Sequence, residues 1–188
     1  MRRFLLPVLL CCLSLSAQAL ELGGVVVSDS AHLGRSNLLL NGAGVRSKFV
    51  FDLYVASLYL SAKKNSAAEV ITDEGEKRIS LQILREINAE DLVSSLDKAI
   101  VRNQTDEELA AIKVEQHEFR SIFSKLVHVK KGDSILLDYL PATGTQVSVN
   151  GAPQGSIPGA AFYTALLKIW LGEKPADETL KLKLLGGK

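Results

Sequence analysis

The chain has 188 residues and nearly balanced charge, with 22 lysines and arginines against 21 aspartates and glutamates. No run of lysines is present, and this composition argues against a surface for nucleic acid or for an anionic membrane. The length suits one domain that buries a sizeable core.

The first 19 residues have the composition of a secretory signal peptide. Arg2-Arg3 precede an apolar run over residues 4–15, and Ala17-Gln18-Ala19 supplies the small-residue cleavage pattern. The run is too short for a membrane-spanning helix, which needs about 20 residues. We predict cleavage after Ala19, a mature domain over residues 20–188, periplasmic or secreted localisation, and no stable membrane insertion. A retained anchor and a lipoprotein are the alternatives.

Both cysteines, Cys11 and Cys12, lie in this N-terminal segment. The mature chain would then have no cysteine and no disulfide, which a domain of this size does not need.

Strand patterns dominate the first half of the mature chain. Residues 25–27 and 38–40 are predicted to form short strands. Phe49 to Leu60 gives the strongest strand signal, because aromatic and β-branched residues dominate it. Both faces of this strand are apolar, which predicts cover on both sides. Asp52 is the exception and needs a partner or an exit to water. Residues 78–87 are predicted to form a further strand.

Helix signals follow. Asn88 is predicted to cap a helix that runs to about Arg102. Thr105 opens a capping-box pattern for a second helix toward Leu126.

Strands over residues 134–140, 145–149 and 152–157 come next, with Asn150-Gly151 as a type I′ turn before the last one. Helices are predicted from Pro158 to Leu171 and from Pro175 toward Leu185. This order predicts an α+β fold in which an antiparallel β-sheet packs against a layer of helices on one side.

Two glycines precede an arginine in Gly42-Ala43-Gly44-Val45-Arg46. A dinucleotide-binding fingerprint needs a third glycine and a following helix, and here a long strand follows instead. The phosphate-binding interpretation therefore fails. The alternative is that Gly42 and Gly44 mark a bulge or a close backbone approach, with Arg46 as an ordinary surface residue.

The segment over residues 40–46, together with Val55-Ala56-Ser57-Leu58-Tyr59-Leu60, resembles the G-x-G-x-R … A-x-G-x-Y-L core of the chalcone isomerase family. That family also includes plant fatty-acid-binding proteins and exported bacterial chalcone isomerase-like proteins, and the bacterial branch fits best. The resemblance continues in residues 84–87, 89–92 and 165–172 and covers nearly the whole mature chain.

The resemblance implies a chalcone isomerase-like open-faced β-sandwich with a largely apolar ligand cleft between the sheet and the helices. In the isomerases an arginine after the G-x-G organises the anionic oxygen of the substrate, and Arg46 matches it. A strand threonine of the isomerases corresponds to Tyr54, which is closer to the fatty-acid-binding branch.

The remaining polar positions of the isomerases are mostly apolar in this chain. The helix tyrosine falls near Leu92, its lysine and asparagine neighbours near Ser95 and Ala99, and a pocket threonine near Ile169. Isomerisation needs donors aimed at the developing charge, whereas one arginine with aliphatic walls can hold an anionic head and an apolar tail. The resemblance thus favours binding over catalysis, and no catalytic residue is predicted.

Arg46 and Tyr54 are the predicted ligand-binding residues. Eight residues separate them, or roughly 26 Å on an uninterrupted strand, so they share a site only if the chain turns near Ser47-Lys48. A buried arginine keeps its charge and needs an anion. Asp52, Glu86 and a bound carboxylate are the candidates for that anion.

The other chemistry-bearing residues predict neither a metal site nor a cofactor. His117 is expected on a solvated helix face and His128 on a polar strand face, without the second histidine that a zinc-binding helix needs. Trp170 and Tyr59 are expected in the core.

Three functions remain open. The leading one is an exported, non-catalytic binding protein for a small amphipathic carboxylate such as a fatty acid or another lipid-like ligand, with Arg46 as the polar anchor. The second is an intramolecular lyase or isomerase of the chalcone isomerase type, and the third is a structural or chaperone-like envelope protein. No nucleic-acid partner is expected, and the oligomeric state is left open.

Overall fold

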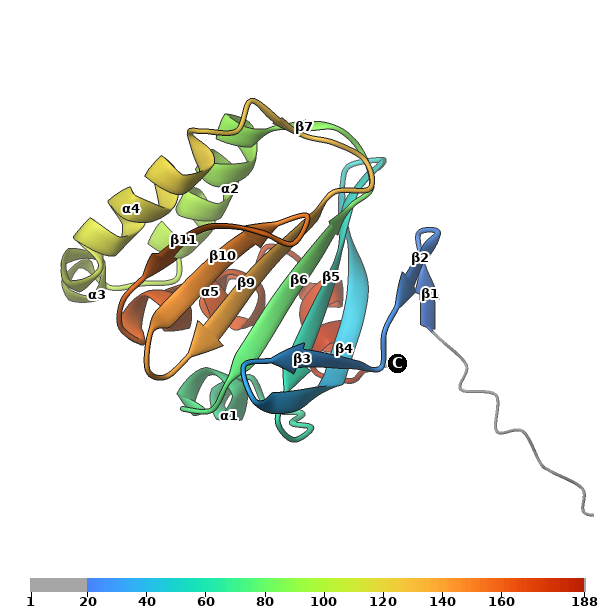
Figure 1. The fold of residues 1–188 in the computed structure, drawn as a ribbon, viewed down its shortest axis with the longest axis horizontal. Helices are drawn as coiled ribbons and strands as arrows, with labels where there is room; N and C mark the ends of the chain where they lie inside the picture. Colours follow the sequence, from blue (N-terminus) through green and yellow to red (C-terminus); the bar gives the residue numbers. More distant parts are fainter. Residues whose placement is uncertain (1–19, 188) are drawn as a thin grey trace, which may run out of the picture.

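The computed structural model describes residues 20–187, so the predicted signal peptide and its cleavage site lie outside the described residues. Its centre is a seven-stranded antiparallel sheet (Figure 1). Helices pack against this sheet, which gives the α+β arrangement that the sequence predicted.

In order across the sheet, its strands are β11 (Ala152–Ile157), β10 (Gly144–Val149), β9 (Ser134–Leu140), β6 (Lys77–Ile83), β5 (Phe51–Leu60), β4 (Ser36–Lys48) and β3 (Ser30–Leu33). Two short ribbons lie apart from it, β1 (Leu20–Leu22) with β2 (Val25–Val27), and β7 (Ile87–Asn88) with β8 (His128–Val129). The helices are α1 (Ala67–Thr72), α2 (Ala89–Val101), α3 (Asp106–Ala111), α4 (Lys113–Phe123), α5 (Ala161–Leu171) and α6 (Glu178–Leu184).

The main core lies between the sheet and α5. This helix is apolar around most of its circumference, and α1, α2 and α6 pack beside it. Trp170 and Tyr163 of α5 are almost completely buried. The hydroxyl of Tyr163 donates to the carbonyl of Leu137 at 3.2 Å, and burial raises the pKa of this tyrosine well above its usual value.

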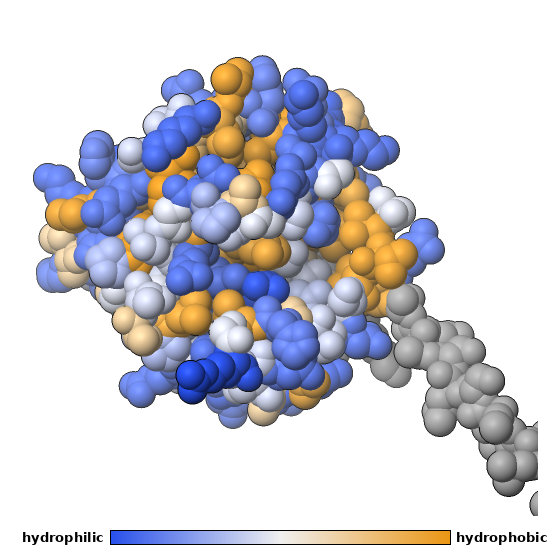
Figure 2. Space-filling view, in the orientation of Figure 1, coloured by the Kyte–Doolittle hydropathy of each residue, from blue (hydrophilic) through white to orange (hydrophobic). Residues whose placement is uncertain are grey.

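Strand β5 is covered on both faces, as its apolar pattern predicted. From Tyr54 to Leu60 every residue is buried. On the face away from the main core, Val27, Ala43 and Val55 form a smaller cluster that joins the β1–β2 ribbon to the sheet. Figure 2 shows the outer side of this ribbon as a hydrophobic surface. Tyr59 is buried, and its hydroxyl donates to the carbonyl of Ser28 at 3.0 Å.

The local signals for caps and turns were confirmed. The side chain of Asn88 caps α2 by accepting from the backbone N–H of Glu90 at 2.9 Å. The capping box of Thr105 is present at the start of α3. Asn150 and Gly151 take the positive φ angles of 52° and 77° that a type I′ turn needs.

Several predicted boundaries were wrong. The predicted helix from Thr105 to Leu126 is divided into α3 and α4 at Ile112, because this side chain turns into the core while α3 buries none of its own. The strand predicted over 78–87 leaves the sheet after Ile83, and the strand predicted from Phe49 begins at Phe51. The last helix begins after Asp177, its N-cap, rather than at Pro175.

Within residues 20–187, no helix combines the length and the apolar character needed to cross a membrane. The same part of the chain contains no cluster of three or more histidine, cysteine or acidic side chains arranged to hold a metal ion.

Candidate functional site

The hairpin of β4 and β5 brings the two predicted ligand-binding residues together. The chain reverses at residues 49–50, and Arg46 lies directly opposite Tyr54 in the register of the two strands. Directly opposed residues of an antiparallel pair place their side chains on the same face. The turn that Arg46 and Tyr54 need in order to share a site is therefore present.

The anion that Arg46 contacts is Asp177, a residue that the motif did not point to. Arg46 Nη1 donates to Asp177 Oδ2 at 3.1 Å, and the two side chains are 20% and 22% exposed. The prediction that Asp52 or Glu86 is the protein carboxylate beside Arg46 was wrong. Asp52 accepts from the hydroxyl of Ser47 at 2.6 Å, and Glu86 lies 3.6 Å from His128 Nδ1.

The hydroxyl of Tyr54 also has its hydrogen-bond partner within the protein. This hydroxyl accepts from Trp170 Nε1 at 3.2 Å, and the side chain lies in the main core. Burial raises the pKa of Tyr54, with Asp177 adding to the effect and Trp170 and Arg46 opposing it. The phenol therefore stays neutral at physiological pH. Arg46, Tyr54, Trp170 and Asp177 are called the Arg46 cluster below.

The two glycines before Arg46 allow α6 to lie against β4. A side chain at Gly42 would place its Cβ 2.0 Å from the carbonyl oxygen of Lys183, and one at Gly44 would lie 3.0 Å from Leu180 Cδ1. The register of β4 and β5 also shifts between Leu40 and Gly42. The bulge and the close approach predicted for these glycines are both confirmed, and the approaching element is a helix.

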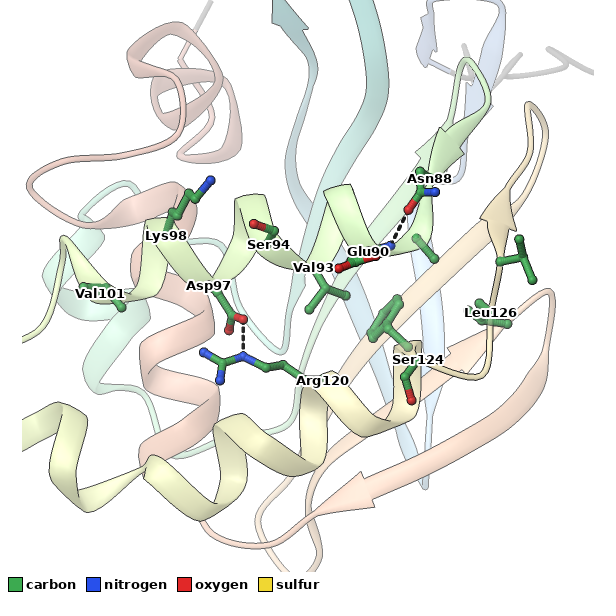
Figure 3. Close-up of a pocket in the computed structure, with 13 residues that line it drawn as sticks. Asn88, Glu90, Val93, Ser94, Asp97, Lys98, Val101, Arg120, Ser124 and Leu126 are labelled. Carbon is green, nitrogen blue, oxygen red and sulfur yellow. Dashed lines mark hydrogen bonds and ion pairs between the residues drawn. The ribbon is translucent and has the colours of Figure 1, made fainter.

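A groove with a cavity volume of about 790 Å³ lies between α2 and α4 (Figure 3). We call it the α2–α4 groove. It is lined by Asn88, Ala89, Glu90, Val93, Ser94, Asp97, Lys98, Val101, Arg120, Phe123, Ser124, Leu126 and Val127.

An ion pair crosses this groove. Figure 3 shows Arg120 reaching from α4 toward Asp97 on α2, where its Nε donates to Asp97 Oδ2. The other oxygen of Asp97 accepts from Gln116 Nε2 at 3.1 Å. Within residues 20–187 Arg120 makes no other side-chain hydrogen bond, and its side chain is 51% exposed. Because a guanidinium has five N–H groups, most of its donor capacity remains open to a ligand.

A second cavity of about 520 Å³ lies between β1, β4 and α6. Its lining includes Gly42, Gly44 and Val45 but not Arg46 or Tyr54, and neither of these two residues lines the α2–α4 groove. The predicted ligand-binding residues thus lie together, but in neither of these cavities.

A family model described as chalcone isomerase-like matches residues 19–186. The chain belongs to the chalcone isomerase-like family. Comparison with curated protein sequences gave no match.

The chalcone isomerase-like fold is also found in a solved relative. The crystal structure of a fatty-acid-binding protein from Arabidopsis thaliana superposes with a TM-score of 0.65, at 18% sequence identity, over 87% of this chain and 92% of that one. This likeness shows the fold, a curled antiparallel sheet with several helices.

The structure gives the surroundings of the four residues that the resemblance puts near the polar positions of the isomerases. Leu92, Ala99 and Ile169 are buried in the main core, and Ser95 is exposed on α2. These three apolar side chains pack against other apolar groups, so they offer no donors to a reacting oxygen.

Proposed function

We propose that the protein is an exported, non-catalytic binding protein for a small amphipathic carboxylate such as a fatty acid, held in the α2–α4 groove. The observation that carries this proposal is the pairing of an apolar groove of about 790 Å³ with an arginine whose donors are largely unused. Ligand sites usually have volumes of roughly 300–1,000 Å³ and combine apolar walls with a few polar groups.

The groove offers each part of such a ligand a matching surface. Val93, Phe123 and Leu126 form apolar wall for a hydrocarbon tail. The free N–H groups of Arg120 can bind the carboxylate, while its Nε keeps the pair with Asp97. Each buried CH₂ contributes about 0.8 kcal/mol, so affinity should rise about fourfold per added carbon until the groove is filled.

Binding is favoured over catalysis by the residues at the isomerase positions. Isomerisation requires hydrogen-bond donors directed at the developing charge, and Leu92 and Ile169 supply none. Membership of a family that contains fatty-acid-binding proteins, and the fold shared with one of them, support the same choice.

Export to the periplasm or medium, as in the exported bacterial branch of the family, is part of the proposal. It is supported by the signal-peptide composition of the first 19 residues.

Arg46 and Tyr54 form a second proposed anchor for the same class of ligand. A carboxylate that reached Arg46 would have to displace Asp177, which holds the guanidinium at 3.1 Å. Replacing Asp177 by Asn removes the competing charge and should strengthen binding if Arg46 is the anchor. The substitution should leave affinity unchanged if the ligand lies in the α2–α4 groove.

The test combines native mass spectrometry of the exported protein with calorimetric titration of saturated carboxylates from octanoate to hexadecanoate. We expect a co-purified lipid, a chain that begins at Leu20, and affinity that rises with chain length. Val93→Phe places a ring inside the groove and should weaken binding at least tenfold. The matched control is Val114→Phe, at an exposed valine of α4 outside the groove lining.

The role of Arg120 is tested with charge-neutral variants. Arg120→Gln should weaken carboxylate binding by about 1.5–3 kcal/mol, the range for a hydrogen bond to a charged group. The double variant Arg120→Gln with Asp97→Asn avoids an unpaired carboxylate and should show the same loss. Unchanged affinity in these variants and in Val93→Phe would exclude the groove as the binding site.

A further inference from the structure

Three consecutive apolar side chains project from the turn between β4 and β5. Phe49 is 91% exposed, Val50 86% and Phe51 52%. In Figure 1 this turn extends past the end of the sheet. Turns are usually polar, and a run of three exposed apolar residues is unfavourable in water unless it serves an interaction.

The backbone conformation at position 49 does not favour a phenylalanine. Phe49 has a φ of 56°, in the left-handed region where glycine and asparagine are the common residues. Such conformations are often retained at functional sites. A bulky aromatic side chain is thus placed at the tip where a small polar residue would fit the backbone better.

Unpaired cations surround the tip. Lys48 immediately precedes Phe49, and the guanidinium carbon of Arg85 lies 4.2 Å from the ring centroid of Phe51. Neither basic residue forms an ion pair within the described part of the chain.

Two further lysines belong to the adjoining turn before β9. Lys130 and Lys131 precede Gly132, whose N–H donates to the carbonyl of Ile83 at 2.8 Å. Leu84, the residue after β6, donates its backbone N–H to the carbonyl of Leu53 in β5 at 2.9 Å. These bonds place both turns at the same end of the sheet.

The carboxylates at this end have partners of their own. Asp52 accepts from Ser47, and Glu86 lies beside His128. Asp133 accepts from the backbone N–H of Lys130, a bond that lowers the pKa of Asp133. Within residues 20–187, Lys48, Arg85, Lys130 and Lys131 form no ion pair. Glu90 and Asp91 begin α2 near the same end, so the cations act through their place beside the apolar residues and not through an excess of positive charge over this whole end.

The tip lies close to one end of the α2–α4 groove. Arg85, which contacts Phe51, is three residues before Asn88 in the groove lining, a span of at most about 11 Å. Val127 lines the same end, is 74% exposed, and accepts from the backbone N–H of Ala89 at 3.2 Å.

We infer that Phe49, Val50 and Phe51 dock the protein on the surface of an anionic phospholipid bilayer, with Lys48, Arg85, Lys130 and Lys131 contacting the headgroups. The apolar tip enters the headgroup region, as interfacial anchors do, without a spanning segment. The reason for such docking rests on the proposed function, because it brings the mouth of the groove to the source of an amphipathic ligand. The docking itself does not require that function.

A bilayer fits this surface better than a protein partner does. A convex tip of three residues buries little area against a protein, whereas stable protein interfaces bury roughly 1,200–2,000 Å² in total. A fluid bilayer closes around a convex tip and gains from each cation near its anionic surface, by about fivefold in binding per Lys or Arg.

Vesicle flotation of the mature protein tests the inference. The vesicles are phosphatidylcholine with phosphatidylglycerol, compared with phosphatidylcholine alone, in low and high salt. We expect partition to the anionic vesicles to be strong and to fall with salt. The double variant Phe49→Asn/Val50→Ser should lose partition at least tenfold, and Lys130→Glu/Lys131→Glu should lose it on anionic vesicles only.

The matched control is Val114→Ser/Leu182→Ser, which removes two exposed apolar residues away from the tip and should retain partition. Circular dichroism checks that all variants fold, and Asn suits the left-handed backbone at position 49. The inference is overturned if the unmodified protein does not bind the anionic vesicles. It is also overturned if Phe49→Asn/Val50→Ser binds them as well as the unmodified protein does. Capture of a protein through this tip without vesicle binding also overturns it.

The vesicle experiment can succeed or fail independently of the carboxylate-binding experiment that tests the proposed function. Partition of a protein that binds no carboxylate in solution supports docking and contradicts the groove. Carboxylate binding that is intact in a protein without partition supports the groove and contradicts docking. The tip variant should keep its carboxylate affinity, because none of its altered residues lines the groove.

Discussion

The Arg46 cluster and the α2–α4 groove each hold an arginine beside an aspartate, but they differ in what remains available to a ligand. Arg46 is mostly covered, its anion comes from the cap of α6, and the neighbouring hydroxyl of Tyr54 is taken by Trp170. Arg120 is half exposed, and about 790 Å³ of space adjoins it. A motif can locate a cation, but the partners around that cation decide whether it can bind anything else.

The difference originates in how each aspartate is held. Asp177 accepts from the N–H of Leu180 at 3.0 Å and is therefore fixed at the start of α6, which the small residues of β4 allow to lie close. Asp97 and Arg120 belong to two helices that leave a groove between them. Variants that loosen α6 should thus affect the Arg46 cluster and leave the groove unchanged.

The largest effect is expected from Gly42→Ala. Its Cβ would lie 2.0 Å from a backbone carbonyl of α6, which cannot move without displacing the helix, so we expect a loss of about 3 kcal/mol or more of unfolding free energy. Gly44→Ala is the matched control, because its new Cβ meets Leu180 Cδ1 and Lys183 Cβ at 3.0 Å but no backbone atom, so it should cost less, about 1–2 kcal/mol. Urea unfolding measures both. Equal costs would show that α6 does not depend on this close approach.

A moderate effect is expected at Asp177. Asp177→Ala removes both the helix cap and the ion pair and should cost about 1–2 kcal/mol. Asp177→Asn keeps the cap, because asparagine caps as well as aspartate, and should cost less than about 1 kcal/mol, the usual range for a partly exposed pair. Thermal unfolding of the two variants separates the cap from the charge. A larger loss in Asp177→Asn than in Asp177→Ala would contradict this assignment.

Local sequence signals predicted much of the fold because they act over a few residues. The caps at Asn88 and Thr105 and the turn at Asn150-Gly151 satisfy backbone groups of their immediate neighbours, so their sequence is sufficient to recognise them. The break at Ile112 was missed because a helix-compatible sequence is interrupted there by the burial of one side chain against distant elements.

The sequence predicted part of the Arg46 cluster and nothing of the α2–α4 groove. The motif pointed to Arg46 and Tyr54, and the hairpin places them opposite each other, while their ligand-binding role stays a prediction. Asp177 lies 131 residues from Arg46, and no local pattern connects the two. The groove depends on how two helices lie beside each other. The cations around the apolar tip come from three separate segments, near residues 48, 85 and 130. A search for a lysine-rich run could not detect that tip, since each segment contributes only one or two cations.

The smallest effect concerns the neutral phenol of Tyr54 at alkaline pH. Burial raises its pKa in the folded protein above the usual 10.0, so in the unfolded chain the phenol loses its proton at lower pH than in the folded state. The stability that this group contributes is present below about pH 10 and is lost as the pH rises, because only the unfolded chain gains from ionisation. Tyr54→Phe lacks the group in both states. Between about pH 8 and about pH 10, the stability difference between the unmodified protein and Tyr54→Phe should narrow by about 0.4 kcal/mol.

Tyr139→Phe, at a tyrosine of β9, supplies the reference for the loss of a hydroxyl elsewhere in the sheet. A stability difference at Tyr54 that stays constant across this range would mean that the phenol ionises as readily in the folded protein as in the unfolded one, and that the Arg46 cluster is open to solvent after all.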